Sequence, residues 1–185
     1  TLVRVGLLTG MRRLELIGLR WTDIDLDGRT ITVEGQLDGE DLADTKTEAG
    51  ERTIDIGDEL AGILVDHGAA EMARLSRLDS ARSDLVFTNK DGRALDRRSI
   101  SRWYAQRASR AMIGDNGLHA LRHTAISRWL MAGIPISVVA SWAGHSSPEI
   151  TLRLYAWALP SQTADYANRV SIVPQIVPHP LSMSA

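Results

Sequence analysis

The sequence has 185 residues, of which 44% are apolar, and its formal net charge at pH 7 is −2. A chain of this length can form one compact domain with its own hydrophobic core. The absence of cysteine excludes disulfide bonds and thiolate metal sites. No apolar run reaches the roughly eighteen residues of a membrane span, and no signal peptide opens the chain, so we expect a protein that is neither membrane-bound nor secreted.

The first half of the chain predicts helices that flank a few short strands. Apolar periodicity indicates helices over 2–8, which Gly10 ends, over 12–19, and over 58–78. β-Branched residues indicate strands over 30–33 and 52–56. The polar segment 37–51 between these strands is expected to be a long, exposed hairpin connection.

The second half is predicted to be helical, with glycine and proline between the helices. The expected helices cover 96–112, 118–132, 136–143, 148–157 and 160–168. The fold class is therefore mainly α with a small antiparallel β-sheet, an α+β arrangement.

The predicted helices and strands form a single domain over 1–170. Residues 171–185 contain three prolines and are expected to be a tail that is either disordered or docked on a neighbouring protomer. The chain starts at Thr1 inside an apolar run and without an initiator Met, so we expect it to be a fragment of a longer protein.

Arginines are concentrated in the predicted helix over 96–112, at Arg97, Arg98, Arg102, Arg107 and Arg110. A positive strip can contact DNA phosphates even when the whole domain is nearly neutral, although a solvated helix face gives the same pattern. The DNA-binding candidates are Arg97, Arg98, Arg102 and Arg107. The acidic segment 38–44 lacks the spacing of a calcium loop, and we expect no metal site there.

A second group of polar residues follows in the predicted helices after position 117. His119 and Arg122 are three positions apart on one helix face, so both can donate hydrogen bonds to one phosphate. His145 follows Gly144 at a turn, and Tyr155 comes ten residues later. The two helices joined by the turn at 133–135 also match a helix-turn-helix unit, which binds DNA without cutting it.

Five segments, taken in order, resemble the catalytic domain of the tyrosine recombinase (phage integrase) family. They are TGMRRLELIGLRWTDIDL at 9–26, DTKTEAGERTIDI at 44–56, HALR at 119–122, AGHSS at 143–147 and LYA at 154–156. The second is similar to a β-hairpin whose lysine reaches the active site, and the last to the segment of the nucleophile. Each motif alone is common, but five in the family's order are specific.

The resemblance implies a tyrosine recombinase catalytic-domain fold and an enzyme that breaks and rejoins DNA strands. Tyr155 is implied to attack a phosphodiester, which gives a 3′-phosphotyrosine and a free 5′-hydroxyl before strand exchange and religation. Arg12 and Arg122 would then hold the negative charge of the transition state, because guanidinium groups donate to two oxygens and stay charged. His119 and His145 would add further donors.

Two more residues complete the implied site. Lys46 is the candidate general acid for the leaving 5′-oxygen. Glu15 lies one helical turn from Arg12 and is expected to orient the arginines or His119. The bond energy is conserved in the phosphotyrosine, so no ATP is called for, and we expect no cofactor.

The resemblance also implies partners and a location. These are a double-stranded DNA recombination site, a homotetramer on that DNA, an N-terminal DNA-binding domain outside this sequence, and the cytoplasm of a bacterial or phage-infected cell. Two alternatives stay open, a type IB topoisomerase-like nicking and closing enzyme and a non-catalytic helix-turn-helix-like DNA-binding module.

Some residues compete for these roles. Tyr104 precedes the HALR segment, which is the wrong order for the nucleophile, and Tyr166 lies too far beyond Gly144. His123 is expected to point to a different face from Arg122 and to be structural. His67 is expected to lie at the surface.

Overall fold

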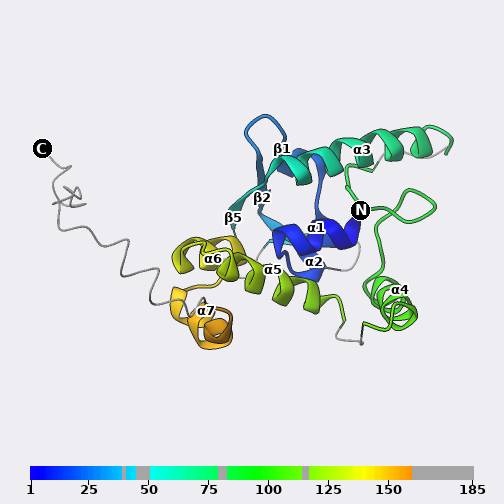
Figure 1. Cartoon of the computed structure of the whole chain (residues 1–185). Coiled ribbons are helices and arrows are strands. Elements are labelled where there is room, and N and C mark those ends of the chain that lie inside the picture. Colours follow the sequence, from blue (N-terminus) through cyan, green and yellow to red (C-terminus); the bar gives the residue numbers. More distant parts are fainter. Residues whose placement is uncertain (39–40, 45–50, 79–82, 114–116, 160–185) are drawn as a thin grey trace, which may run out of the picture.

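The structure, a computed structural model, describes residues 1–38, 41–44, 51–78, 83–113 and 117–159 (Figure 1). Its α-helices are α1 (Leu2–Thr9), α2 (Arg13–Gly18), α3 (Asp58–Leu75), α4 (Arg97–Arg110), α5 (His119–Met131), α6 (Ile136–Ala143) and α7 (Pro148–Tyr155). Short 3₁₀ turns occur at Trp21–Asp23 (η1) and Ala156–Ala158 (η3). Most of the predicted helices are confirmed, and the predicted helix 160–168 and tail 171–185 lie outside the described residues.

The helix ends follow the capping residues in the sequence. The side chain of Asp96 accepts a hydrogen bond of 2.7 Å from the main-chain N–H of Ser99, which caps the start of α4. Gly10 and Gly144 end α1 and α6 in the left-handed conformation, with φ of 60° and 63°. At Gly10 a side chain would also come within 2.8 Å of the Trp129 ring, so the close packing of α1 beside α5 requires glycine there.

The strands form two small antiparallel sheets. β1 (Ile24–Asp25), β2 (Thr30–Val33) and β5 (Arg52–Asp55) form a three-stranded sheet in the order β1-β2-β5. In its register Ile31 pairs with Ile54, and Val33 with Arg52. β3 (Gly35–Asp38) and β4 (Asp41–Asp44) pair with each other in a second sheet, so the predicted connection between β2 and β5 contains a further hairpin.

The hydrophobic core has two parts, and α5 contributes to both. The larger part packs α1, α2 and the three-stranded sheet against α3, with Ile100 and Tyr104 of α4 at its edge. The smaller part holds Ile126 and Leu130 of α5 against α6 and Tyr155. In Figure 1, α5 accordingly runs below α1 and α2 and leads to α6 and α7. Tyr155 is therefore anchored in a core and is not on a free loop.

His67 of α3 is partly buried, so the prediction that it lies at the surface is wrong. Its ring lies between Trp21 and Phe87, with ring centroids 6.1 Å and 5.2 Å away. Its Nε2 is 2.8 Å from the main-chain oxygen of Val86. The residue joins α3 to the segment after it, which is a structural role.

Within the described part of the chain, no helix is both long enough and apolar enough to cross a lipid bilayer.

Candidate active site

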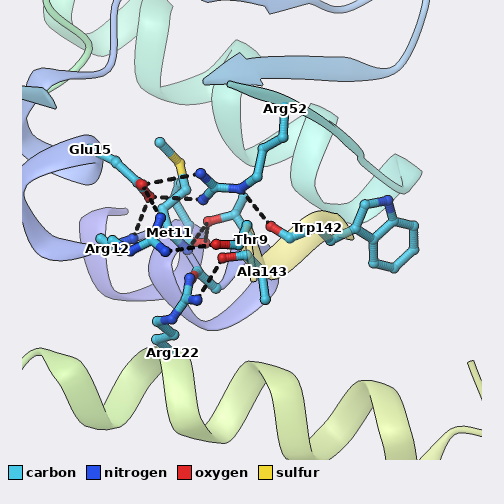
Figure 2. A network of polar contacts seen from close by, with 11 residues as sticks. Thr9, Met11, Arg12, Glu15, Arg52, Arg122, Trp142 and Ala143 are labelled. Atoms are coloured by element: carbon cyan, nitrogen blue, oxygen red, sulfur yellow. Dashed lines mark hydrogen bonds and ion pairs between the residues drawn. The ribbon is translucent and has the colours of Figure 1, made fainter. Parts of the chain in front are cut away.

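Three arginine side chains donate hydrogen bonds to consecutive main-chain carbonyls at the C-terminal end of α6. The pairs are Arg52 Nε with Trp142 O at 2.7 Å, Arg122 Nη2 with Ala143 O at 2.5 Å, and Arg12 Nη2 with Gly144 O at 2.8 Å (Figure 2). The last carbonyls of a helix have no partner within the helix and carry its partial negative charge. The end of α6 therefore gathers the arginines from α5, β5 and the start of α2 in one place.

Arg122 is the most deeply held of the two predicted catalytic arginines. Its side chain leaves α5 and is 4% exposed, and its Nη1 donates to the carbonyl of Gly10 at 2.8 Å. Burial, reinforced by the charge of Arg12, lowers the pKa of Arg122 to about 10. The guanidinium still carries its charge at neutral pH, so it can receive a phosphate without a change of protonation.

Glu15 fixes the positions of Arg12 and Arg52. Its Oε1 accepts from Arg12 Nη1 at 2.8 Å and from Arg52 Nη1 at 3.1 Å, and its Oε2 accepts from Arg52 Nη2 at 2.8 Å. Burial favours a raised pKa for this carboxyl, which is 2% exposed, but the hydrogen bonds and charges of Arg52 and Arg12 outweigh burial and hold the pKa at about 2. The expectation that Glu15 orients arginines thus fits its contacts.

His145 follows Gly144 directly and lies beside the arginines. Its Nδ1 is 2.7 Å from Oγ1 of Thr151, a fully buried residue of α7, which fixes the orientation of the ring. Burial, together with the charges of Arg122 and Arg12, lowers the pKa of His145 to about 4. The ring is therefore neutral at pH 7 and can act as a hydrogen-bond donor without bringing more positive charge to the site.

Tyr155 lies at the end of α7 with its hydroxyl against α5. The side chain is 3% exposed, and the hydroxyl is 2.6 Å from Nδ1 of His123. The rings of His123 and His119 meet edge to face, with centroids 4.7 Å apart. Burial raises the pKa of Tyr155, and the charge of Arg122 opposes this only in part. His119, His123 and Tyr155 thus form one row of contacting rings.

The described structure brings most of the predicted site residues into two connected groups. Arg12, Glu15 and Arg122 meet around the end of α6, next to His145, and the second group is the row of rings that contains Tyr155. Lys46 lies outside the described residues. The four predicted DNA-binding arginines are exposed on α4, where Arg107 Cζ lies 4.2 Å from the centre of the Trp103 ring.

Two residues of this arrangement were missed by the sequence analysis. His123 is predicted to be structural, and its contact with the Tyr155 hydroxyl is not part of that prediction. The spacing of four residues nevertheless places His123 on the same helix face as His119. For Arg52 the sequence predicts only a place in a strand. Arg52 and Ile54 are two positions apart in β5, so both side chains lie on the buried face of this strand. A charged side chain on a buried face indicates a buried partner of opposite charge.

Within the described ranges, no three histidine, aspartate or glutamate side chains are grouped as a metal ion requires. The site is instead built from guanidinium and imidazole donors, which suit an anionic substrate.

Comparisons with known proteins agree on a family. The model of the Phage integrase family matches residues 1–161. A XerC-like tyrosine recombinase of Caldanaerobacter subterraneus is 27% identical over 172 residues, which cover 83% of this chain and 44% of that protein. The chain therefore spans less than half the length of this relative.

Solved structures show the same fold. The integrase of the transposon Tn1549, solved in complex with a circular intermediate DNA, superposes with a TM-score of 0.71 and 22% identity, over 91% of this chain and 58% of that one. The XerA recombinase superposes with a TM-score of 0.66 and 23% identity, over 92% of this chain and 56% of that one.

Proposed function

The chain belongs to the phage integrase family, and on that basis we propose that it is the catalytic domain of a site-specific DNA recombinase whose nucleophile is Tyr155. The observation that carries the proposal is the meeting of Arg12 and Arg122 on adjacent carbonyls at one helix end, directly before His145. Both guanidiniums point at a place where partial negative charge already gathers. Each Nη atom carries two N–H groups, so a DNA phosphate beside this helix end can accept hydrogen bonds from both arginines while the carbonyls keep theirs.

The proposed reaction is an in-line attack of the Tyr155 hydroxyl on a DNA phosphodiester. The transition state gathers negative charge on the non-bridging oxygens, and fixed donors aimed at that charge lower its energy. We assign this work to Arg12 and Arg122, with His119 and His145 as further donors. Lys46 is proposed to give a proton to the leaving 5′-oxygen, so that the products are a 3′-phosphotyrosine and a 5′-hydroxyl.

The proposed working unit is larger than this chain. Since the relatives are longer, we propose that residues 1–170 are one domain of a longer protein, in which an N-terminal domain completes the grip on double-stranded DNA. Four protomers would assemble on two DNA sites, in the cytoplasm of a bacterial or phage-infected cell. Residues 171–185 are proposed as a tail that is disordered or docks on a neighbouring protomer.

A covalent-adduct experiment tests the nucleophile. The chain, alone and within the longer protein, is incubated in EDTA with a library of nicked duplexes, and protein–DNA complexes that survive denaturation are isolated and sequenced. We expect an adduct with the wild type and with Tyr104→Phe, and none with Tyr155→Phe. Mass spectrometry of the digested adduct should find the nucleotide on Tyr155.

Two outcomes would contradict the proposal. An adduct that survives in Tyr155→Phe would place the nucleophile elsewhere, with Tyr166 the next residue to test. Firm DNA binding without any adduct would favour the non-catalytic helix-turn-helix-like module. A topoisomerase-like enzyme is separated from a recombinase by mixing two labelled duplexes that carry the recovered site, because only a recombinase joins strands from different duplexes.

A further inference from the structure

The proposed reaction requires that Tyr155 lose its phenolic proton as it attacks. A tyrosine hydroxyl holds its proton at neutral pH, with an ordinary pKa of about 10. The surroundings of Tyr155 raise this pKa, since burial disfavours the phenolate more than the charge of Arg122 favours it. A nearby group that can take the proton during the attack would remove this obstacle.

His123 is placed to do so. Its Nδ1 lies 2.6 Å from the Tyr155 hydroxyl, which is within the range of about 2.6–3.2 Å required of a general base. The imidazole is otherwise exposed, so a proton taken from the tyrosine can pass on to water. α5 holds it rigidly, one residue after the buried Arg122.

Neighbouring groups of the site are less suited to this task. Arg122 keeps its own proton at neutral pH and cannot accept another. His145 has its Nδ1 engaged with Thr151 Oγ1. The ring of His119 meets the ring of His123, with which it makes an edge-to-face contact, and so lies one step further from the hydroxyl along the row of rings.

We propose that His123 is a catalytic residue, the general base that takes the phenolic proton of Tyr155 during cleavage and returns it during religation. The inference rests on the proposed function. In cleavage the phenolic O–H bond breaks and its proton moves to His123 Nδ1, while the phenolic oxygen bonds to phosphorus. The bond from phosphorus to the 5′-oxygen breaks, and that oxygen takes a proton from the general acid, for which Lys46 is the candidate.

The test separates proton transfer from mere positioning. Single-turnover rates of adduct formation are measured with His123→Asn, whose Oδ1 can occupy the place of Nδ1 and accept the hydrogen bond but cannot take the proton at neutral pH. We expect His123→Asn and His123→Ala to be slower than wild type by about a hundredfold or more. Both substitutions should leave the fold intact because His123 is exposed. Unchanged thermal melting and unchanged DNA binding of the two variants are the controls.

Two chemical substitutions then show which of the two proton transfers is impaired in His123→Asn. A substrate with sulfur in place of the bridging 5′-oxygen needs no general acid, because a thiolate leaves readily. This substrate should therefore restore the rate of adduct formation in Lys46→Ala and leave the rate in His123→Asn low. Replacing Tyr155 by 3,5-difluorotyrosine, a more acidic phenol, should restore much of the rate in His123→Asn and change the wild type little.

The outcomes also separate this inference from the proposed function. A His123→Asn rate near that of the wild type would show that His123 only positions the hydroxyl, and would overturn the inference alone. A slow His123→Asn that the sulfur substrate restores, or that difluorotyrosine leaves slow, would also overturn it. If the wild type forms no adduct on any substrate while Tyr155→Phe behaves identically, the proposed function falls and this inference falls with it.

Discussion

The surroundings of His119 and His145 lower the pKa of both imidazoles. For His145 burial is the largest cause of the lowered pKa, and the charges of Arg122 and Arg12 add to it. For His119 burial is again the largest cause, and the charges of His123 and Arg122 are the next largest. Both pKa values are lowered in consequence. A bound phosphate would act in the opposite sense, because a nearby negative charge favours the protonated ring.

The lowered pKa of His145 predicts a dependence of stability on pH. Below its ordinary pKa of 6.5 the unfolded chain takes up a proton at this residue, whereas the folded chain does so only near pH 4. The free energy of unfolding should therefore fall as the pH is lowered from 6.5 to 4.5. Glu15 acts in a lower window, because its pKa of about 2 in the folded state gives a stabilisation that is lost only below its ordinary value of 4.5.

Urea unfolding of the wild type and of His145→Asn, at both ends of the interval from pH 6.5 to 4.5, measures the effect. The asparagine can still accept a hydrogen bond from Thr151 but does not titrate. Its free energy of unfolding should fall less than that of the wild type over this interval. The same fall in both proteins would show that the environment of His145 does not hold its ring neutral.

The sequence predicts which residues form the candidate site, and their roles stay predictions, but it does not predict the contacts between them. The spacing of His119 and Arg122 gives their shared helix face, and the five ordered segments give Tyr155. The contact of His123 with Tyr155 depends on how α7 packs against α5, which are separated by α6 and its two turns. Helix periodicity describes the faces of one helix, and it contains no information on which face a later helix covers.

At the scale of elements, Arg52 and Glu15 join β5, α2 and the end of α6. Arg52 binds Glu15 with two hydrogen bonds and the carbonyl of Trp142 with a third, and both side chains of the ion pair are nearly fully buried. A buried carboxylate that loses a cationic partner keeps its desolvation cost. The pair therefore connects β5, α2 and the end of α6 in the arrangement in which Arg12 contacts the carbonyl of Gly144.

Removing Arg52 should destabilise the fold strongly. We expect Arg52→Met to lower the free energy of unfolding by about 3–5 kcal/mol, the usual cost of breaking a buried ion pair. The double variant Glu15→Gln/Arg52→Met should lose less than the sum of the single variants, because it does not bury a carboxylate that has lost Arg52 and keeps only Arg12 as its cationic partner. Urea denaturation at neutral pH measures all three.

The exposed pair of Arg4 and Glu59 provides the matched control. Its N–O distance is 3.5 Å and its side chains are 61% and 69% exposed, so Arg4→Met should change the free energy of unfolding by no more than about 1 kcal/mol. Equal losses for Arg52→Met and Arg4→Met would mean that the buried pair contributes no more than a surface pair.

The elements themselves were largely predictable where the sequence carries strong local signals. Gly10, Gly144 and Asp96 mark helix ends by chemistry that acts within a few residues, and the structure confirms the helix ends at these positions. The pairing of β3 with β4 was not predicted, because 35–44 is acidic and rich in glycine and lacks the alternation of a strand. Pairing there depends on main-chain hydrogen bonds, which leave little trace in a sequence.

At the scale of the whole molecule, a net charge of −2 must be reconciled with the proposed DNA partner. The arginines of α4 offer a local positive surface, and one contact relates this helix to the candidate site. Arg13, the first residue of α2 and the neighbour of Arg12, donates from Nη1 to Oγ of Ser101 at 3.0 Å. The face of α4 that carries Ser101 is therefore the face next to the proposed catalytic arginines.

The predicted DNA-binding arginines do not all share that face. Arg97 and Arg98 precede Ser101 by four and three residues, so they lie on its side of the helix, whereas Arg102 follows Ser101 directly and lies about 100° around the helix from it. Arg107 lies over the Trp103 ring and lines a groove with residues of α1 and α5, such as Leu7 and Leu121. We therefore expect Arg97 and Arg98 to contact the DNA backbone, and Arg107 to have a packing role.

The salt dependence of DNA binding tests this division. Each phosphate contact that is lost should lower the slope of log affinity against log salt by about 1, so Arg97→Ala/Arg98→Ala should weaken binding and reduce the slope by about 2. Arg107→Ala, which removes one charge from another side of the same helix, should leave the slope unchanged. Fluorescence anisotropy with one duplex over a series of salt concentrations gives both quantities. If Arg107→Ala reduced the slope as well, DNA would have to reach both sides of α4, and the binding surface would extend around the helix to the groove with α1 and α5.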